Sequence, residues 1–129
     1  MINHRAKRNA FRKWTFFFSL LLISTLLLAA CGNNPIRDGA KGMKETLAEL
    51  KMALDQNDAA KVKELGQKLE EKWKSFEDGV KEKSGDLYEK TERSLKTIGA
   101  GVEVTPLDAK TLKQAAEELD QALTEVEKL

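Results

Sequence analysis

The sequence predicts an all-α fold, an antiparallel up-down four-helix bundle, from three observations. Four segments repeat apolar residues at the three- and four-residue spacing of one helix face. Val, Ile and aromatic residues never alternate with polar ones over a run, so no strand pattern competes. The connections are short, and helices joined in this way pack antiparallel with their neighbours. A three-helix core with the first helix loosely attached, or an extended helical hairpin that dimerises, would also bury these faces.

The first 30 residues have the layout of a secretory signal peptide. Residues 1–13 carry five basic residues and no acidic one, and residues 14–30 are uncharged and largely apolar. The sequence Leu28-Ala29-Ala30-Cys31 resembles the lipobox of bacterial lipoproteins. This resemblance implies cleavage before Cys31 and attachment of acyl chains such as palmitate, which would anchor the domain on the extracytoplasmic face of the cell membrane. An uncleaved signal-anchor helix is the alternative, although a membrane span usually needs about 20 apolar residues.

Removal of residues 1–30 changes the composition. The mature chain keeps 17 Lys and Arg against 21 Asp and Glu, because five of the 22 basic residues and none of the acidic ones lie in the signal. A net charge near −4 leaves no basic surface for nucleic acid. The only histidine, His4, is lost, and the only cysteine is Cys31. Without these side chains the domain lacks the usual nucleophile pairs and zinc ligands, so we expect no enzymatic activity.

The lipidated cysteine and a flexible tether are expected over residues 31–38, because Gly, Asn and Pro disfavour a helix interior. The helical bundle domain then spans residues 39–129. Its first helix is expected over residues 39–56 and ends at Asn57-Asp58. The apolar face of this helix consists of Met43, Leu47, Leu50 and Leu54.

The second helix is expected over residues 59–83, with Asp58 as its N-cap and Gly85 in the left-handed position after its end. Gly66 and Gly79 interrupt it, and they indicate either close helix contact, a bend or the approach of a ligand. Trp73 and Phe76 are expected to be core anchors. The apolar face consists of Val62, Leu65, Leu69, Trp73, Phe76 and Val80.

The third helix is expected to start from Asp86, which with Glu89 resembles a capping box. We expect Tyr88, a member of its apolar face, to be half-buried. The longest break is expected over residues 99–106. The fourth helix would follow with Thr105 as its cap, Pro106 in its first turn and Asp108 at its third position. Its apolar face consists of Leu112, Ala115, Ala116, Leu119, Ala122, Leu123, Val126 and Leu129.

The carboxylates of the second helix are the candidates for metal chemistry. Glu70, Trp73 and Glu77 are spaced i, i+3 and i+7, so they share one side of a helix. Clustered carboxylate oxygens suit hard cations. The other interpretation is an ordinary solvated face, since lysines such as Lys74 and Lys81 alternate with the acids.

Four short patterns occur in order within residues 43–126: Asp58-Ala-Ala-Lys61, Leu69-Glu-Glu-Lys-Trp73-Lys-Ser-Phe-Glu77, Asp86-Leu-Tyr-Glu-Lys90 and Glu118-Leu-Asp-Gln-Ala-Leu123. With them the chain resembles the helical extracytoplasmic domains of Efe-type iron-uptake proteins. The resemblance implies an accessory of metal (iron) uptake, with a membrane transporter as partner and Glu70 and Glu77 as metal ligands. Those domains commonly combine histidine with glutamate, and the mature chain has no histidine. A structural or protein-interaction module of the cell envelope, with no metal, is the alternative function.

Overall fold

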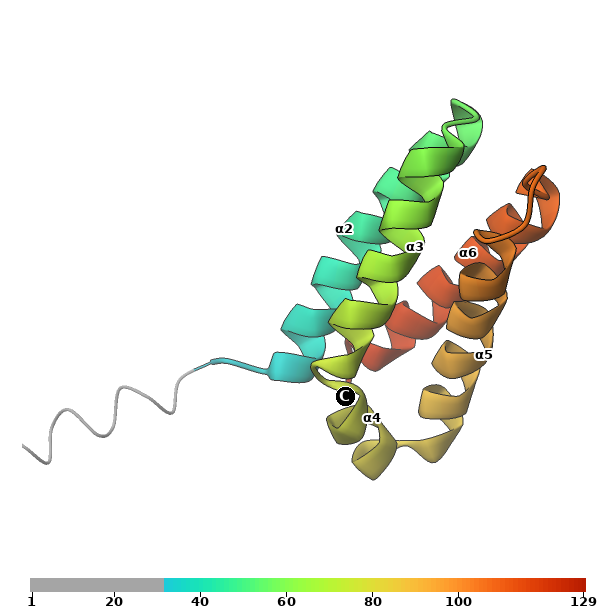
Figure 1. The fold of residues 1–129 in the computed structure, drawn as a ribbon. Helices are drawn as coiled ribbons and strands as arrows, with labels where there is room; N and C mark the ends of the chain where they lie inside the picture. The colour runs from blue at the N-terminus through green and yellow to red at the C-terminus, as the bar shows by residue number, and fades with distance from the viewer. Residues whose placement is uncertain (1–31) are drawn as a thin grey trace, which may run out of the picture. The chain divides into compact units, whose positions relative to one another are not determined.

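Helices make up most of residues 32–129, the part of the chain that the computed structural model describes (Figure 1). No strand occurs in this range, which confirms the all-α class. The signal segment and Cys31 lie outside the described residues. The helices are α2 (Pro35–Asp55), α3 (Ala59–Lys74), α4 (Glu77–Lys83), α5 (Gly85–Gly101) and α6 (Ala109–Val126).

The most extensive helix contacts join α2 to α3, α5 to α6, and α2 to α6 (Figure 1). Smaller contacts join α3 to α5, and the short α4 packs mainly on α5. Because α2 contacts both α3 and α6 over much of its length, the first helix belongs to the core and is not loosely attached.

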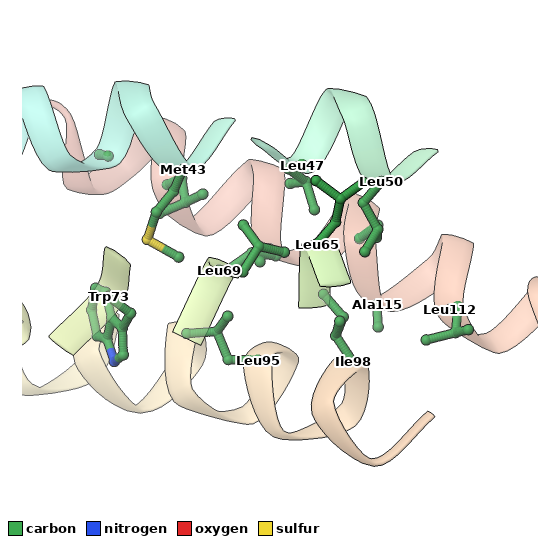
Figure 2. Close-up of a cluster of buried hydrophobic side chains, with 14 of the residues drawn as sticks. Met43, Leu47, Leu50, Leu65, Leu69, Trp73, Leu95, Ile98, Leu112 and Ala115 are labelled. Carbon is green, nitrogen blue, oxygen red and sulfur yellow. The ribbon is translucent and has the colours of Figure 1, made fainter. Parts of the chain in front are cut away.

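The core is built from the apolar stripes that the sequence predicts. Met43, Leu47 and Leu50 of α2 meet Leu65 and Leu69 of α3, and residues of α5 and α6 complete the same cluster (Figure 2). All core residues lie between Ile36 and Val126, and residues 34–129 form one compact unit. This unit therefore contains its own complete hydrophobic core.

The expected tether ends earlier than predicted, because α2 begins at Pro35 and not at residue 39. The Asn34 side chain accepts hydrogen bonds from the backbone N–H groups of Ile36 and Arg37 at 3.1 and 3.2 Å. Pro35 occupies the first turn, where its missing N–H has no helical partner to lose. Burial of Ile36, which is 5% exposed, fixes this first turn to the core.

The expected helix over residues 59–83 is interrupted, so the described residues form five helices where four were expected. The Ser75 hydroxyl donates to the carbonyl of Lys72 at 2.6 Å, and the Phe76 N–H donates to the carbonyl of Trp73 at 3.1 Å. These contacts tighten the end of α3. Phe76, with φ −142°, leaves the helical conformation before α4 starts at Glu77. The break buries the Phe76 ring, which is 6% exposed.

The start of α5 also differs from the expectation. The expected cap was Asp86, with Gly85 in a left-handed conformation. Instead the Ser84 side chain accepts the Leu87 N–H at 3.3 Å. Gly85 is the first residue of α5, and Gly32 is the one glycine of the described range with positive φ.

The connection to the last helix is shifted toward the C-terminus. The expected break over 99–106 is wrong in its first part, because α5 continues through Gly101. Asp108, not Thr105, is the N-cap of α6. The Thr105–Pro106 peptide is cis and lies in the connection, outside the helix.

Candidate functional sites

Glu70 and Glu77 border one small hollow of about 150 Å³, although α3 breaks between them. Trp73 lies between the two carboxylates in sequence and lines the same hollow. The three residues are neighbours as predicted, but Glu77 belongs to α4 and not to the helix that carries Glu70 and Trp73. Glu92 and Leu95 of α5 close the other side of the hollow, and they were not predicted to take part.

The Glu92 carboxylate is already engaged. It accepts a hydrogen bond of 2.7 Å from the indole N–H of Trp73 and pairs with the Lys96 ammonium at 3.1 Å. Lys74 and Lys96 also border the hollow, so its charge is mixed. Only Glu70 and Glu77 therefore remain to offer carboxylate oxygens to an added ion.

In the range 32–129, no three His, Cys, Asp or Glu side chains are grouped so that they could hold a metal ion. The two available carboxylates would leave most coordination positions of a hard cation to water, because Ca²⁺ takes six to eight oxygen ligands and Mg²⁺ six. The geometry of the hollow therefore does not form a closed metal site.

The aromatic residues form a cluster beside this hollow. Trp73, which is 2% exposed, meets Phe76 edge-on with ring centroids 5.2 Å apart. Tyr88 stacks on Trp73 at 5.9 Å and is partly exposed, and the Lys81 ammonium lies 5.1 Å from its ring centroid. Trp73 and Phe76 are therefore core anchors, as predicted, and Tyr88 is half-buried. Trp73 lies at one end of the core cluster (Figure 2).

Both glycines of the expected second helix lie at close contacts. A Cβ atom on Gly66 would lie 3.0 Å from Val102, and one on Gly79 would lie 3.2 Å from Ile36. This confirms close contact between elements as the reason for these glycines.

A cleft of about 490 Å³ lies between the α2–α3 turn and the α5–α6 connection. Its lining includes Leu54, Asn57 and residues 102–107. The Lys63 ammonium pairs with the Glu103 carboxylate at 2.6 Å and links α3 to that connection. Every buried side-chain nitrogen and oxygen in the described residues has a hydrogen-bond partner. The cleft therefore contains no unpaired buried group that would select a particular small molecule.

A larger groove of about 660 Å³ lies on the outer side of α5 and α6. We call it the α5–α6 groove. Its α5 side is formed by Arg93, Lys96, Thr97, Ala100, Gly101 and, just beyond the helix, Val104. Its α6 side is formed by Asp108, Thr111 and Leu112. No sequence motif indicates this groove, in which the small residues Thr97, Ala100 and Gly101 stand among longer side chains.

Two features of the groove stand out. Val104 is 55% exposed, and Met52, on α2, is the other large hydrophobic side chain in the described range with such exposure. Asp108 is held in place as the cap of α6. The hydroxyl and the backbone N–H of Thr111 donate to its carboxylate at 2.6 and 3.1 Å, and these bonds lower the pKa of Asp108 below its ordinary value.

Searches against models of protein families, curated proteins and solved structures give no match to this chain. Of the helices described here, none is long and apolar enough to cross a membrane.

Proposed function

We propose that this protein is a lipid-anchored, extracytoplasmic, non-enzymatic module that binds protein in the cell envelope. The anchor is the acylated Cys31, as the lipobox resemblance implies. The single observation that carries the binding role is the α5–α6 groove, where exposed Val104 borders a hollow with small side chains. An exposed apolar side chain beside a hollow gives a partner protein apolar surface to bury, and such burial favours association.

The proposed architecture of the module is the antiparallel up-down bundle. Its four long helices are α2, α3, α5 and α6, and α4 is a short insertion after α3. The short connections and the packing of α2 on both α3 and α6 support this arrangement. Most side chains that line the groove lie on α5 and α6, and side chains on helices are held more firmly than those on loops, which suits a contact surface.

The anchor is tested by replacing Cys31 with alanine. The variant should lose acyl labelling and should leave the membrane fraction when cells are fractionated. Retention of the variant in membranes at the level of the unaltered chain would show that acylation of Cys31 is not what holds the protein there.

The binding role is tested by placing a photo-crosslinking residue at position 100 in the membrane-anchored protein. Ala100 lines the groove, and Ala48, an exposed alanine of α2, gives a matched control. Crosslinked protein adducts should form from position 100 and not from position 48. The absence of any adduct at position 100 would contradict a protein-binding role for this face.

Binding of a metal ion is a second candidate function, and one observation favours it. Glu70 and Glu77 border the same hollow and have no ion pair among the described residues. A cation such as iron would be the cargo of an uptake system, held by these two carboxylates and by water. Because only two carboxylates are available, we expect such binding to be weak.

Calorimetric titration of residues 32–129 with chelate-buffered Fe³⁺, with Cu²⁺ and with Ca²⁺ tests this candidate. The test variant is Glu70→Gln/Glu77→Gln. The control is Glu45→Gln/Glu49→Gln, which removes two exposed carboxylates of α2. Binding that is lost in the test variant and kept in the control would support metal binding. Equal titrations of all three chains would exclude this site.

A further inference from the structure

We propose that the occupant of the α5–α6 groove is a second copy of this chain, in an antiparallel, two-fold symmetric pair. This inference rests on the proposed protein-binding function and specifies its partner. Three properties of the groove carry it: its shape, the distribution of its charges and the position of its exposed apolar side chain.

The shape of the groove is self-complementary. Val104, in the connection just after α5, is 55% exposed at one end of the groove, and the small side chains of Thr97 and Ala100 line the groove from α5. Thr97 and Ala100 lie four and one residues before Gly101, the last residue of α5, so the hollow lies within about 6 Å of the end of α5, beyond which Val104 follows. A two-fold axis midway between them brings Val104 of each copy into the hollow of the other, as an isologous interface requires. Ala100 then lies close to that axis.

The floor of the groove cannot easily be filled from within the chain. A Cβ atom on Gly101 would lie 2.7 Å from Leu112, so this position is held as glycine by the packing of α5 on α6. Leu112 itself is fully buried beneath the floor. The hollow is thus a permanent feature of the α5–α6 contact and is available to a side chain from outside.

The charges at the two ends of the groove are of opposite sign. Arg93 lies eight residues before Gly101, the last residue of α5, which is about 12 Å along the helix. Asp108 lies at the opposite end, at the start of α6. No ion pair among the described residues uses Arg93. Antiparallel pairing places Arg93 of each copy toward Asp108 of the other, whereas parallel pairing would place like charges together.

A second copy accounts for these features better than an unrelated helix does. An unrelated partner needs only an apolar strip, but the groove offers a projection, a matching hollow and both charges on one face. A common membrane also concentrates anchored copies, so a modest affinity is sufficient for pairing. The antiparallel arrangement puts the two chain starts at opposite ends of the pair, so anchored bundles would lie side by side along the membrane surface.

Single-cysteine variants of residues 32–129 test the pairing, since this range has its own core and no cysteine. Ala100→Cys, close to the two-fold axis, should form a disulfide-linked dimer under mild oxidation. Ala48→Cys should remain monomeric, apart from slow random oxidation. Equal rates of dimer formation at the two positions would overturn the proposal.

Sedimentation equilibrium of the cysteine-free chain provides the second measurement. Val104→Asp should weaken self-association at least about tenfold, because it places a charge in the centre of the interface. Met52→Asp, the control with similar exposure, should leave it unchanged. A monomer at every concentration would also overturn the pairing. In cells, a crosslink from position 100 to a different protein would refute the second copy as occupant while preserving the protein-binding function.

Discussion

Replacing Gly39 with alanine tests how closely α2 packs against the break between α3 and α4. A Cβ atom at position 39 would overlap with Cδ1 of the Phe76 ring. The Phe76 ring has little freedom to move, because it is 6% exposed and lies edge-on against Trp73 with centroids 5.2 Å apart. The substitution therefore forces the ring or the helix to shift.

The magnitude follows from two opposing effects. Alanine is favoured over glycine within a helix by about 1 kcal/mol. Overpacking of a filled core costs about 1–3 kcal/mol. Gly42 provides the matched control, since a Cβ atom there would meet only the flexible end of Lys72, at 3.5 Å. Both variants gain the same helix propensity from alanine, so this gain cancels when they are compared. Gly39→Ala should therefore be less stable than Gly42→Ala by about 1–3 kcal/mol, the cost of overpacking.

Thermal unfolding of residues 32–129 measures this difference. For a domain of this size, each kcal/mol shifts the midpoint by roughly 4–8 °C. A double-mutant cycle with Phe76→Ala identifies the cause, because removal of the ring should make Gly39→Ala as favourable as Gly42→Ala. Equal stabilisation by both alanines in the unaltered background would refute the packing of Phe76 on α2.

Three further predictions concern single contacts. Asp108→Ala should lower the unfolding midpoint, while Asp108→Asn keeps an oxygen for the N–H of Thr111. Hydrogen bonds from Thr111 lower the pKa of Asp108 in the folded chain below its value in the unfolded chain. The ionised Asp108 carboxylate therefore stabilises the fold above the unfolded-state pKa, and this contribution is lost as the pH falls through the folded-state pKa. Unfolding midpoints of unaltered and Asp108→Asn chains should therefore converge toward acid pH, and parallel curves would contradict this. Trp73→Phe should reduce the free energy of unfolding, measured in urea, by about 1.5–3 kcal/mol, because it removes a hydrogen bond to the charged Glu92. An unchanged urea midpoint would show that this hydrogen bond contributes nothing to stability. Leu119→Ala, at a fully buried site of α6, should cost about 2–5 kcal/mol with an unchanged denaturant slope, and a loss below 1 kcal/mol would be inconsistent with a filled core.

The helices and their buried faces could be predicted because the periodicity of apolar residues reports directly on burial. Met43, Leu69 and Leu123 are fully buried, as their spacing indicates. Boundaries were predicted less well where tertiary contacts decide the outcome. The break at Phe76 has no glycine or proline to indicate it, and it depends on the space beside Gly39.

The same distinction applies to the candidate sites. Glu70 and Trp73 share a hollow because helical spacing makes them neighbours on α3, whereas Glu77 reaches the same hollow from the start of α4, after the break. Glu92 reaches that hollow from α5, and its arrival depends on the register between two helices that local sequence does not specify. The α5–α6 groove is defined by small side chains, and a sequence contains no direct sign of where neighbouring helices leave such side chains uncovered.

The contact between α2 and α6 has a consequence for the order in which the chain can fold. It joins the first and last described helices, and α6 contributes Leu119, Leu123 and Val126 to the core. Synthesis proceeds from the N-terminus, so α2 and α3 can associate as a hairpin before α6 exists. A nascent chain that has reached only residue 108 must leave in water the apolar surface of α2 that packs on α6. Completion of this domain is thus coupled to the release of its final helix, and truncation before residue 109 should yield a chain that aggregates or is degraded.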